Sequence, residues 1–279
     1  MKTISHTYRD GMTNEWSLWE TKVADAPILM IFPALGVRAS YYDGLANAFH
    51  QAGWHVCSAD YRGMGKSSVR ASRKQDFGYD TLVQDTLEAL NTLKSSFPAS
   101  PLYLLGHSLG GQIGSILAAR EPELMSGLIL AASCLVDPNG WPKGQQFRTR
   151  LAVHVFPPLA KLIGYFPGKQ VGFGGREAKT LMRDWGHSGR TGRYELAHSD
   201  QQDEARLAQL KLKTLALTFE GDDFCPAQAS QHLYGKFHPD SAITHRHLTS
   251  REMDPKGLNH FKWTRFPEVI VQEVNQWRN

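Results

Sequence analysis

The sequence has few cysteines, little excess of charge and no long apolar run. Three cysteines in 279 residues, Cys57, Cys134 and Cys225, lie too far apart for a disulfide framework or a zinc site. The formal net charge is +4 with no dense basic run, which argues against a nucleic-acid partner. The longest apolar stretch, residues 128–136, is too short for stable membrane insertion. Residues 1–6 lack the apolar core of a signal peptide, so we expect a soluble cytoplasmic protein.

What is present is an alternation of short apolar runs with helical patterns. Two alternating runs within residues 3–20 flank Asp10-Gly11, a favoured turn pair, and predict a hairpin. Continuous apolar runs separated by helices predict an α/β fold with a mostly parallel sheet that is covered on both faces. The expected strands are 28–32, 54–59, 102–105, 127–132, 214–219 and 242–245, and the expected helices are 40–52, 79–97, 109–120 and the segment from residue 267.

Residues 137–200 interrupt this alternation. They contain ten of the 25 glycines, together with several prolines and many aromatic residues. A segment of this length between two core strands usually has a function. We therefore expect a core formed by residues 1–136 and 201–279, and an inserted cap at 137–200 that covers the functional site.

The most informative motif follows the apolar run at 102–105. Residues 106–110 read G-H-S-L-G, and the small and apolar residues after them have helical spacing. Glycines two positions to either side of Ser108 allow a strand to turn sharply into a helix, because strand and helix backbones come close together there. The pattern predicts Ser108 as a nucleophile above the sheet edge, with His107 in a supporting role.

A serine hydroxyl needs a base, and the base needs an acid that holds its tautomer. Around a turn of this kind the acid and then the histidine follow the serine along the chain. Asp222 and Asp223 come directly after the expected strand at 214–219. We favour Asp222, because apolar residues and a proline follow it, and keep Asp223 as the alternative acid.

His260 is the favoured base, because it lies in a loop just before the terminal helix. His247 is the alternative, although it alternates with His245 along an expected strand. No carboxylate or cysteine lies near this histidine pair at ligand spacing, so we expect no metal.

The developing oxyanion needs two N–H donors. One is expected at Leu109, directly after the nucleophile, and the other in the loop after the strand at 28–32. Pro33 has no N–H, which leaves Ala34 or Leu35.

Two nucleotide-binding motifs are incomplete in this sequence. Residues 65–67 read G-K-S, but Asp60 stands where a phosphate-binding loop requires its first glycine. No complete G-x-G-x-x-G lies at a strand-to-helix junction either, so no cofactor is expected.

Three motifs resemble the α/β-hydrolase superfamily, and more narrowly its serine-aminopeptidase-like and monoglyceride-lipase-like branch. Residues 106–111 match G-H-S-x-G-G, residues 60–67 look like D-x-R-G-x-G-x-S, and residues 259–261 are similar to the terminal histidine segment. The resemblance covers nearly the whole chain except 137–200. One departure is Phe32-Pro33, where the branch has His-Gly in the oxyanion loop, and another is a somewhat long spacing of 38 residues from Asp222 to His260.

The resemblance implies the hydrolase fold, a Ser-Asp-His triad and hydrolysis of an ester or amide. We expect a cofactor-independent serine hydrolase that cleaves a small acyl substrate through an acyl-enzyme on Ser108. An acyltransferase using the same triad is one alternative. A ligand-binding protein on the hydrolase scaffold, without catalysis, is the other.

Overall fold

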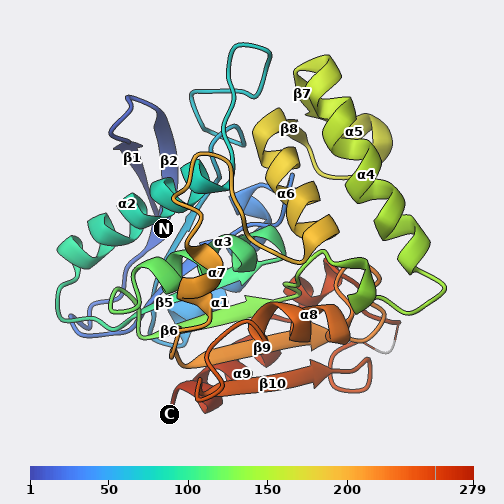
Figure 1. Cartoon of the computed structure of the whole chain (residues 1–279). Coiled ribbons are helices and arrows are strands. Elements are labelled where there is room, and N and C mark those ends of the chain that lie inside the picture. Colours follow the sequence, from blue (N-terminus) through green and yellow to red (C-terminus); the bar gives the residue numbers. More distant parts are fainter. Residues whose placement is uncertain (255) are drawn as a thin grey trace.

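A twisted eight-stranded sheet forms the centre of the protein in a computed structural model that describes residues 1–254 and 256–279 (Figure 1). The strand order is β1-β2-β4-β3-β5-β6-β9-β10. The hairpin of β1 and β2 is antiparallel, β2 is antiparallel to β4, and the remaining pairs are parallel. The strands are β1 (Lys2–Thr7), β2 (Thr13–Trp19), β3 (Ile28–Phe32), β4 (His55–Ala59), β5 (Leu102–His107), β6 (Gly127–Ala131), β9 (Thr214–Phe219) and β10 (Ile243–Leu248). The predicted hairpin and the mostly parallel sheet are both confirmed.

The helices expected from the sequence are present, and the structure also has two short helices that the sequence did not predict, α7 (Asp203–Leu207) and α8 (Ala227–Tyr234). The expected helix at 40–52 divides into a 3-10 turn, η1 (Ala39–Tyr42), and an α-helix. Helices outside the inserted segment are α1 (Asp43–Gln51), α2 (Tyr79–Ser96), α3 (Leu109–Arg120), α7 (Asp203–Leu207), α8 (Ala227–Tyr234) and α9 (Pro267–Arg278), with a further 3-10 turn η3 (Lys262–Arg265).

The all-apolar strand β3 shows how the sheet is buried on both faces. Successive side chains of a strand point to opposite sides. Ile28, Met30 and Phe32 belong to the core that includes the buried residues of α2 and α3. Leu29 and Ile31 belong to the opposite core, which includes those of α1 and α9. A continuous apolar run therefore gives a central strand with no solvent face.

The inserted segment, residues 137–200, connects β6 to the chain that returns to β9. It comprises η2 (Pro138–Gly140), α4 (Gln146–Ile163), β7 (Tyr165–Pro167), α5 (Gly168–Val171), β8 (Arg176–Ala178) and α6 (Lys179–Thr191). The strands β7 and β8 form a separate antiparallel pair. In Figure 1 these elements stand together on one side of the molecule, with α4 beside α6.

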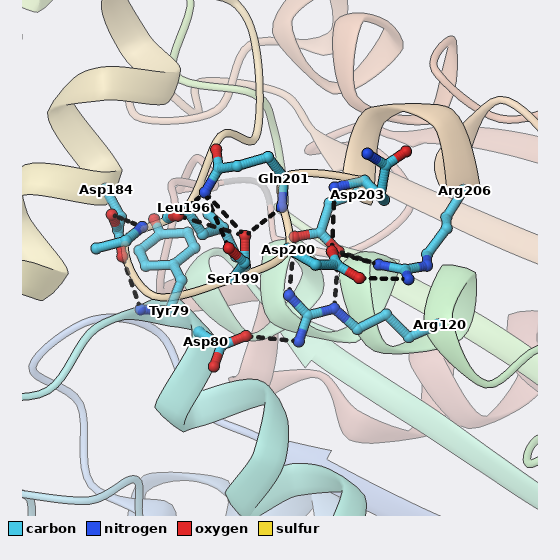
Figure 2. A network of polar contacts seen from close by, with 12 residues as sticks. Tyr79, Asp80, Arg120, Asp184, Leu196, Ser199, Asp200, Gln201, Asp203 and Arg206 are labelled. Atoms are coloured by element: carbon cyan, nitrogen blue, oxygen red, sulfur yellow. Dashed lines mark hydrogen bonds and ion pairs between the residues drawn. The ribbon is translucent and has the colours of Figure 1, made fainter.

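A network of charged side chains fixes the end of this segment to the core (Figure 2). The Asp184 carboxylate on α6 accepts the backbone N–H of Tyr79 at the start of α2 and that of Ala197 beyond α6. The Arg120 guanidinium at the end of α3 binds Asp203 through two nitrogens at 2.7 and 2.8 Å. A paired, hydrogen-bonded network of this kind positions α2, α3 and the returning chain relative to one another.

Gly106, in the turn between β5 and α3, has no room for a side chain. An ideal Cβ at Gly106 would lie 2.3 Å from the carbonyl carbon of Gly110, closer than any side chain can be accommodated. We expect Gly106→Ala to lower the free energy of unfolding by more than about 2 kcal/mol, because backbone must move.

Gly44→Ala is the matched control. Gly44 lies in α1 with a negative φ, and nothing lies within 4 Å of its ideal Cβ. We expect this variant to gain up to about 1 kcal/mol in urea unfolding. Equal stabilities of the two variants would contradict the close-packing argument.

Candidate active site

Ser108 lies at the tip of the turn that joins β5 to α3. Its φ of 54° and ψ of −113° are strained for a residue with a side chain. Its N–H donates to Ala131 O at the end of β6, and its own carbonyl accepts from Gly111 N–H. The turn is the strand-to-helix geometry expected from the glycine spacing, and it leaves Ser108 half-buried at the N-terminus of α3.

Asp222 and His260 are brought together from the end of β9 and from a loop before α9. The His260 Nδ1 atom lies 3.0 and 3.1 Å from the two Asp222 carboxylate oxygens, and both side chains are buried. One of these oxygens also accepts the N–H groups of Phe224 and Cys225 at 2.9 Å. With Asp222 as acceptor, Nδ1 carries the hydrogen and Nε2 keeps its lone pair.

The two alternative residues have other surroundings. Asp223 is exposed, and its carboxylate accepts a 3.4 Å hydrogen bond from Gln145. His247 lies on β10, where its Nδ1 is 3.0 Å from the Thr218 hydroxyl oxygen, which also contacts His245 at 2.8 Å. The geometry therefore favours Asp222 and His260 over Asp223 and His247.

His107 packs behind the turn, with its ring 4.7 Å from that of His260 between centroids. Burial, and to a smaller degree the neighbouring His260, lower the pKa of His107 well below its ordinary value. His107 is therefore neutral. Its Nδ1 lies 2.6 Å from the Tyr42 hydroxyl, which can donate to it.

Tyr42 joins the turn to the loop after β3. Its hydroxyl oxygen accepts the Ala34 N–H at 3.1 Å, while its hydrogen is available to His107. Because the Ala34 N–H is committed to Tyr42, Leu35 remains as the donor that this loop can offer to a substrate oxygen. The Leu109 N–H can also donate to a ligand, since Leu109 is the first residue of α3 and the first N–H groups of a helix lack intrahelical acceptors.

The loop at 60–67 has a structural part in this arrangement. The Asp60 carboxylate accepts the backbone N–H groups of Ala39 and Lys66. The Arg62 guanidinium binds both carboxylate oxygens of Asp85 on α2 at 2.7 and 2.8 Å. These contacts fix the start of η1, and with it Tyr42, beside the sheet.

Sequence reasoning missed Tyr42 and Trp263. Tyr42 is fully buried, but the stretch around it has no recognisable motif, and its neighbour Tyr41 is exposed. Trp263 is also buried; its indole N–H donates to His260 O at 3.0 Å, and its ring stacks on Phe219. The contact of Tyr42 with His107 and the stacking of Trp263 on Phe219 depend on tertiary packing between segments far apart in sequence. Within residues 1–254 and 256–279, no three His, Cys, Asp or Glu side chains are grouped so that they could hold a metal ion, and no helix is long and apolar enough to cross a membrane.

The sheet order, the strand-to-helix turn and the site at the carboxyl ends of the strands define an α/β-hydrolase. Est1E from Butyrivibrio proteoclasticus, solved with ferulic acid, superposes with a TM-score of 0.68 at 13% identity over 98% of this chain and 97% of that one. GrgF from a Penicillium species gives the same TM-score at 18% identity, over 99% and 97% of the two chains. Similarities at this level of identity show the fold.

The family is shown by sequence. A model described as serine aminopeptidase, S33 (Hydrolase_4), matches residues 25–247, and the chain belongs to this family of hydrolases. Rat monoglyceride lipase is 24% identical over 96% of this chain and 87% of its own length. A monoglyceride lipase homolog of monkeypox virus is 30% identical over 50% of this chain and 49% of its own length.

Removal of the Tyr42 hydroxyl tests the bridge between the two loops. Tyr42→Phe leaves the buried Ala34 N–H and His107 Nδ1 without their partner, and each such loss costs about 1–3 kcal/mol. We expect the free energy of unfolding to fall by at least about 2 kcal/mol in urea titrations.

Tyr41→Phe is the control for this change. The Tyr41 hydroxyl donates to Phe261 O at 2.9 Å, but the side chain is exposed. We expect a loss of no more than about 1 kcal/mol, because water replaces the lost partner. A Tyr42→Phe protein as stable as the wild type would show that the bridge contributes nothing.

Proposed function

We propose that this protein is a carboxylic-ester hydrolase in which Ser108, His260 and Asp222 form the catalytic triad. The observation that carries the proposal is the buried Asp222–His260 pair, which lies beside the turn holding Ser108. Membership of a hydrolase family supports the reaction class. The expected cytoplasmic location stays a prediction.

The first half of the reaction forms an acyl-enzyme. The Ser108 Oγ attacks the ester carbonyl carbon while His260 Nε2 takes its proton, and the ionised Asp222 stabilises the imidazolium. The carbonyl oxygen becomes an oxyanion held by the N–H groups of Leu109 and Leu35. Collapse of the intermediate expels the alcohol, which leaves with the proton from His260.

In the second half, His260 takes a proton from water, whose oxygen attacks the acyl carbon. Collapse of the second tetrahedral intermediate then releases the carboxylic acid, while His260 gives its proton back to the Ser108 Oγ. The neutral His107 matters in both halves, because a second positive charge against the His260 ring would oppose proton uptake.

We further propose that residues 137–200 act as a cap that receives an apolar part of the substrate. An aromatic path supports this proposal. The Phe173 ring contacts Trp185 at 5.2 Å and Phe224 at 6.5 Å, and Phe224 lies 5.4 Å from His260, all between ring centroids. Phe224 is 48% exposed, which leaves an apolar face free for a ligand.

The triad is tested by labelling with a fluorophosphonate and by hydrolysis of p-nitrophenyl esters. We expect Ser108→Ala and His260→Ala to abolish labelling and to lower kcat by roughly 10⁴-fold or more. Asp222→Asn should lower kcat by about 10³- to 10⁴-fold, because the wrong histidine tautomer becomes favoured.

Asp223→Asn and His247→Ala are the matched controls and should stay within about threefold of the wild type, the range of substitutions that touch no reacting group. A folded wild-type protein that binds esters but is neither labelled nor active would contradict the proposal and favour a ligand-binding protein. Product analysis with glycerol present distinguishes hydrolysis from acyl transfer.

The apolar cap is tested by the dependence of kcat/KM on acyl-chain length. Each buried methylene contributes about 0.8 kcal/mol, so kcat/KM should rise several-fold per carbon until the site is filled. Phe173→Ala should reduce kcat/KM for octanoate esters about tenfold and leave acetate esters within about twofold. Phe147→Ala, on the exposed face of α4, is the control. Equal losses for both ester lengths would argue against an acyl site beside Phe173.

A further inference from the structure

The inserted segment contacts the loop that carries the proposed oxyanion donor Leu35. An ideal Cβ at Gly36 would lie 2.4 Å from the Gly174 carbonyl carbon and 2.4 Å from Gly175 N. The two backbones are therefore in direct contact, with no room for a side chain between them. The ideal Cβ position of Gly174 is also 3.2 Å from the Leu35 side chain.

The Glu177 carboxyl group holds this turn from inside. Glu177 lies on β8 and is only 4% exposed, and its Oε1 accepts the Gly175 N–H at 2.6 Å. Burial raises the pKa of this carboxyl to about 7, and the Gly175 N–H only partly offsets that effect. Burying a carboxyl group is costly, so packing alone does not account for glutamate at this position.

The surrounding charges do not account for it either. None of the ion pairs found among the described residues involves Glu177. Its neighbour Arg176 donates to Ala71 O and lies over the Tyr165 ring, 3.8 Å from the centroid. Among the residues that the structure describes, the polar contact of the Glu177 carboxyl is the hydrogen bond that it accepts from the Gly175 N–H.

We propose that Glu177 is a positioning residue that holds the Gly174–Gly175 turn against the Leu35–Gly36 backbone and so orients the Leu35 N–H in the oxyanion hole. The inference rests on the proposed function, because it assigns Leu35 as a donor. Glu177 touches no reacting atom. It acts through two stretches of backbone, one in the inserted segment and one after β3.

The test compares three substitutions of Glu177. Glu177→Met removes the acceptor and keeps similar length, whereas Glu177→Asp keeps the charge and withdraws the carboxylate by one methylene. Both should lower kcat for an acetate ester about 10- to 100-fold with KM within about twofold, because a misplaced donor acts mainly in the transition state. Glu177→Gln keeps an oxygen acceptor, so its kcat should stay within about threefold of the wild type.

Glu195→Met is the control, since Glu195 lies in the same segment but is partly exposed and binds Arg193. Amide hydrogen exchange gives a second readout that needs no activity. Peptides covering residues 33–42 and 172–178 should exchange faster in Glu177→Met and Glu177→Asp, and as in the wild type in Glu177→Gln and Glu195→Met.

The proposal is overturned if the folded Asp variant keeps wild-type kcat, if the Gln variant loses as much as the Met variant, or if exchange changes only at 172–178. A wild-type protein that is neither labelled nor active would instead contradict the proposed function. Exchange at residues 33–42 would still decide in that case whether Glu177 holds the loop.

Discussion

The contact between the end of β5 and the first turn of α3 is the constraint on which the rest of the site depends. The Gly106 and Gly110 backbones lie close together, and the chain turns between them with a φ of 54° at Ser108. Such strain persists where the surroundings determine it. Here β5 is buried between β3 and β6, and the Ser133 hydroxyl binds the Gly106 carbonyl at 2.9 Å. Packing within the sheet therefore maintains the strained conformation of Ser108, the proposed nucleophile.

The electrostatics of the site follow from burial of two histidines in contact. The His107 and His260 rings lie 4.7 Å apart between centroids with their planes tilted by 45°, but of the two only His260 has a buried carboxylate partner. Burial keeps His107 neutral, and the Tyr42 hydroxyl satisfies its Nδ1. A positive charge formed during the proposed reaction is therefore stabilised on one ring, because Asp222 faces that ring alone.

The sheet, its parallel arrangement and the turn at Ser108 could be predicted because each follows from a local pattern. Continuous apolar runs are typical of strands buried on both faces, and paired glycines are typical of a close backbone approach. The pairing of Asp222 with His260 needed chain order as well, and its distinction from Asp223 needed geometry. Tyr42 and Glu177 were not predictable, because neither belongs to a recognisable motif and each is tied to a segment distant in sequence. Tyr42 contacts His107, and Glu177 lies 141 residues after Gly36.

The inserted segment contacts the core in two ways, through aromatic side chains and through backbone. Its aromatic side chains extend toward His260 through Phe224, while its backbone at Gly174–Gly175 packs on the loop after β3. Within the segment, four aromatic side chains pack against one another: Phe156, Phe166, Phe173 and Trp185. The backbone contact leaves no room for a side chain, since a single Cβ at Gly36 would separate the two loops. Under the proposed function, the aromatic side chains are therefore the part of the segment that can adapt to a substrate, whereas the glycine turn is fixed by its contact with the loop after β3.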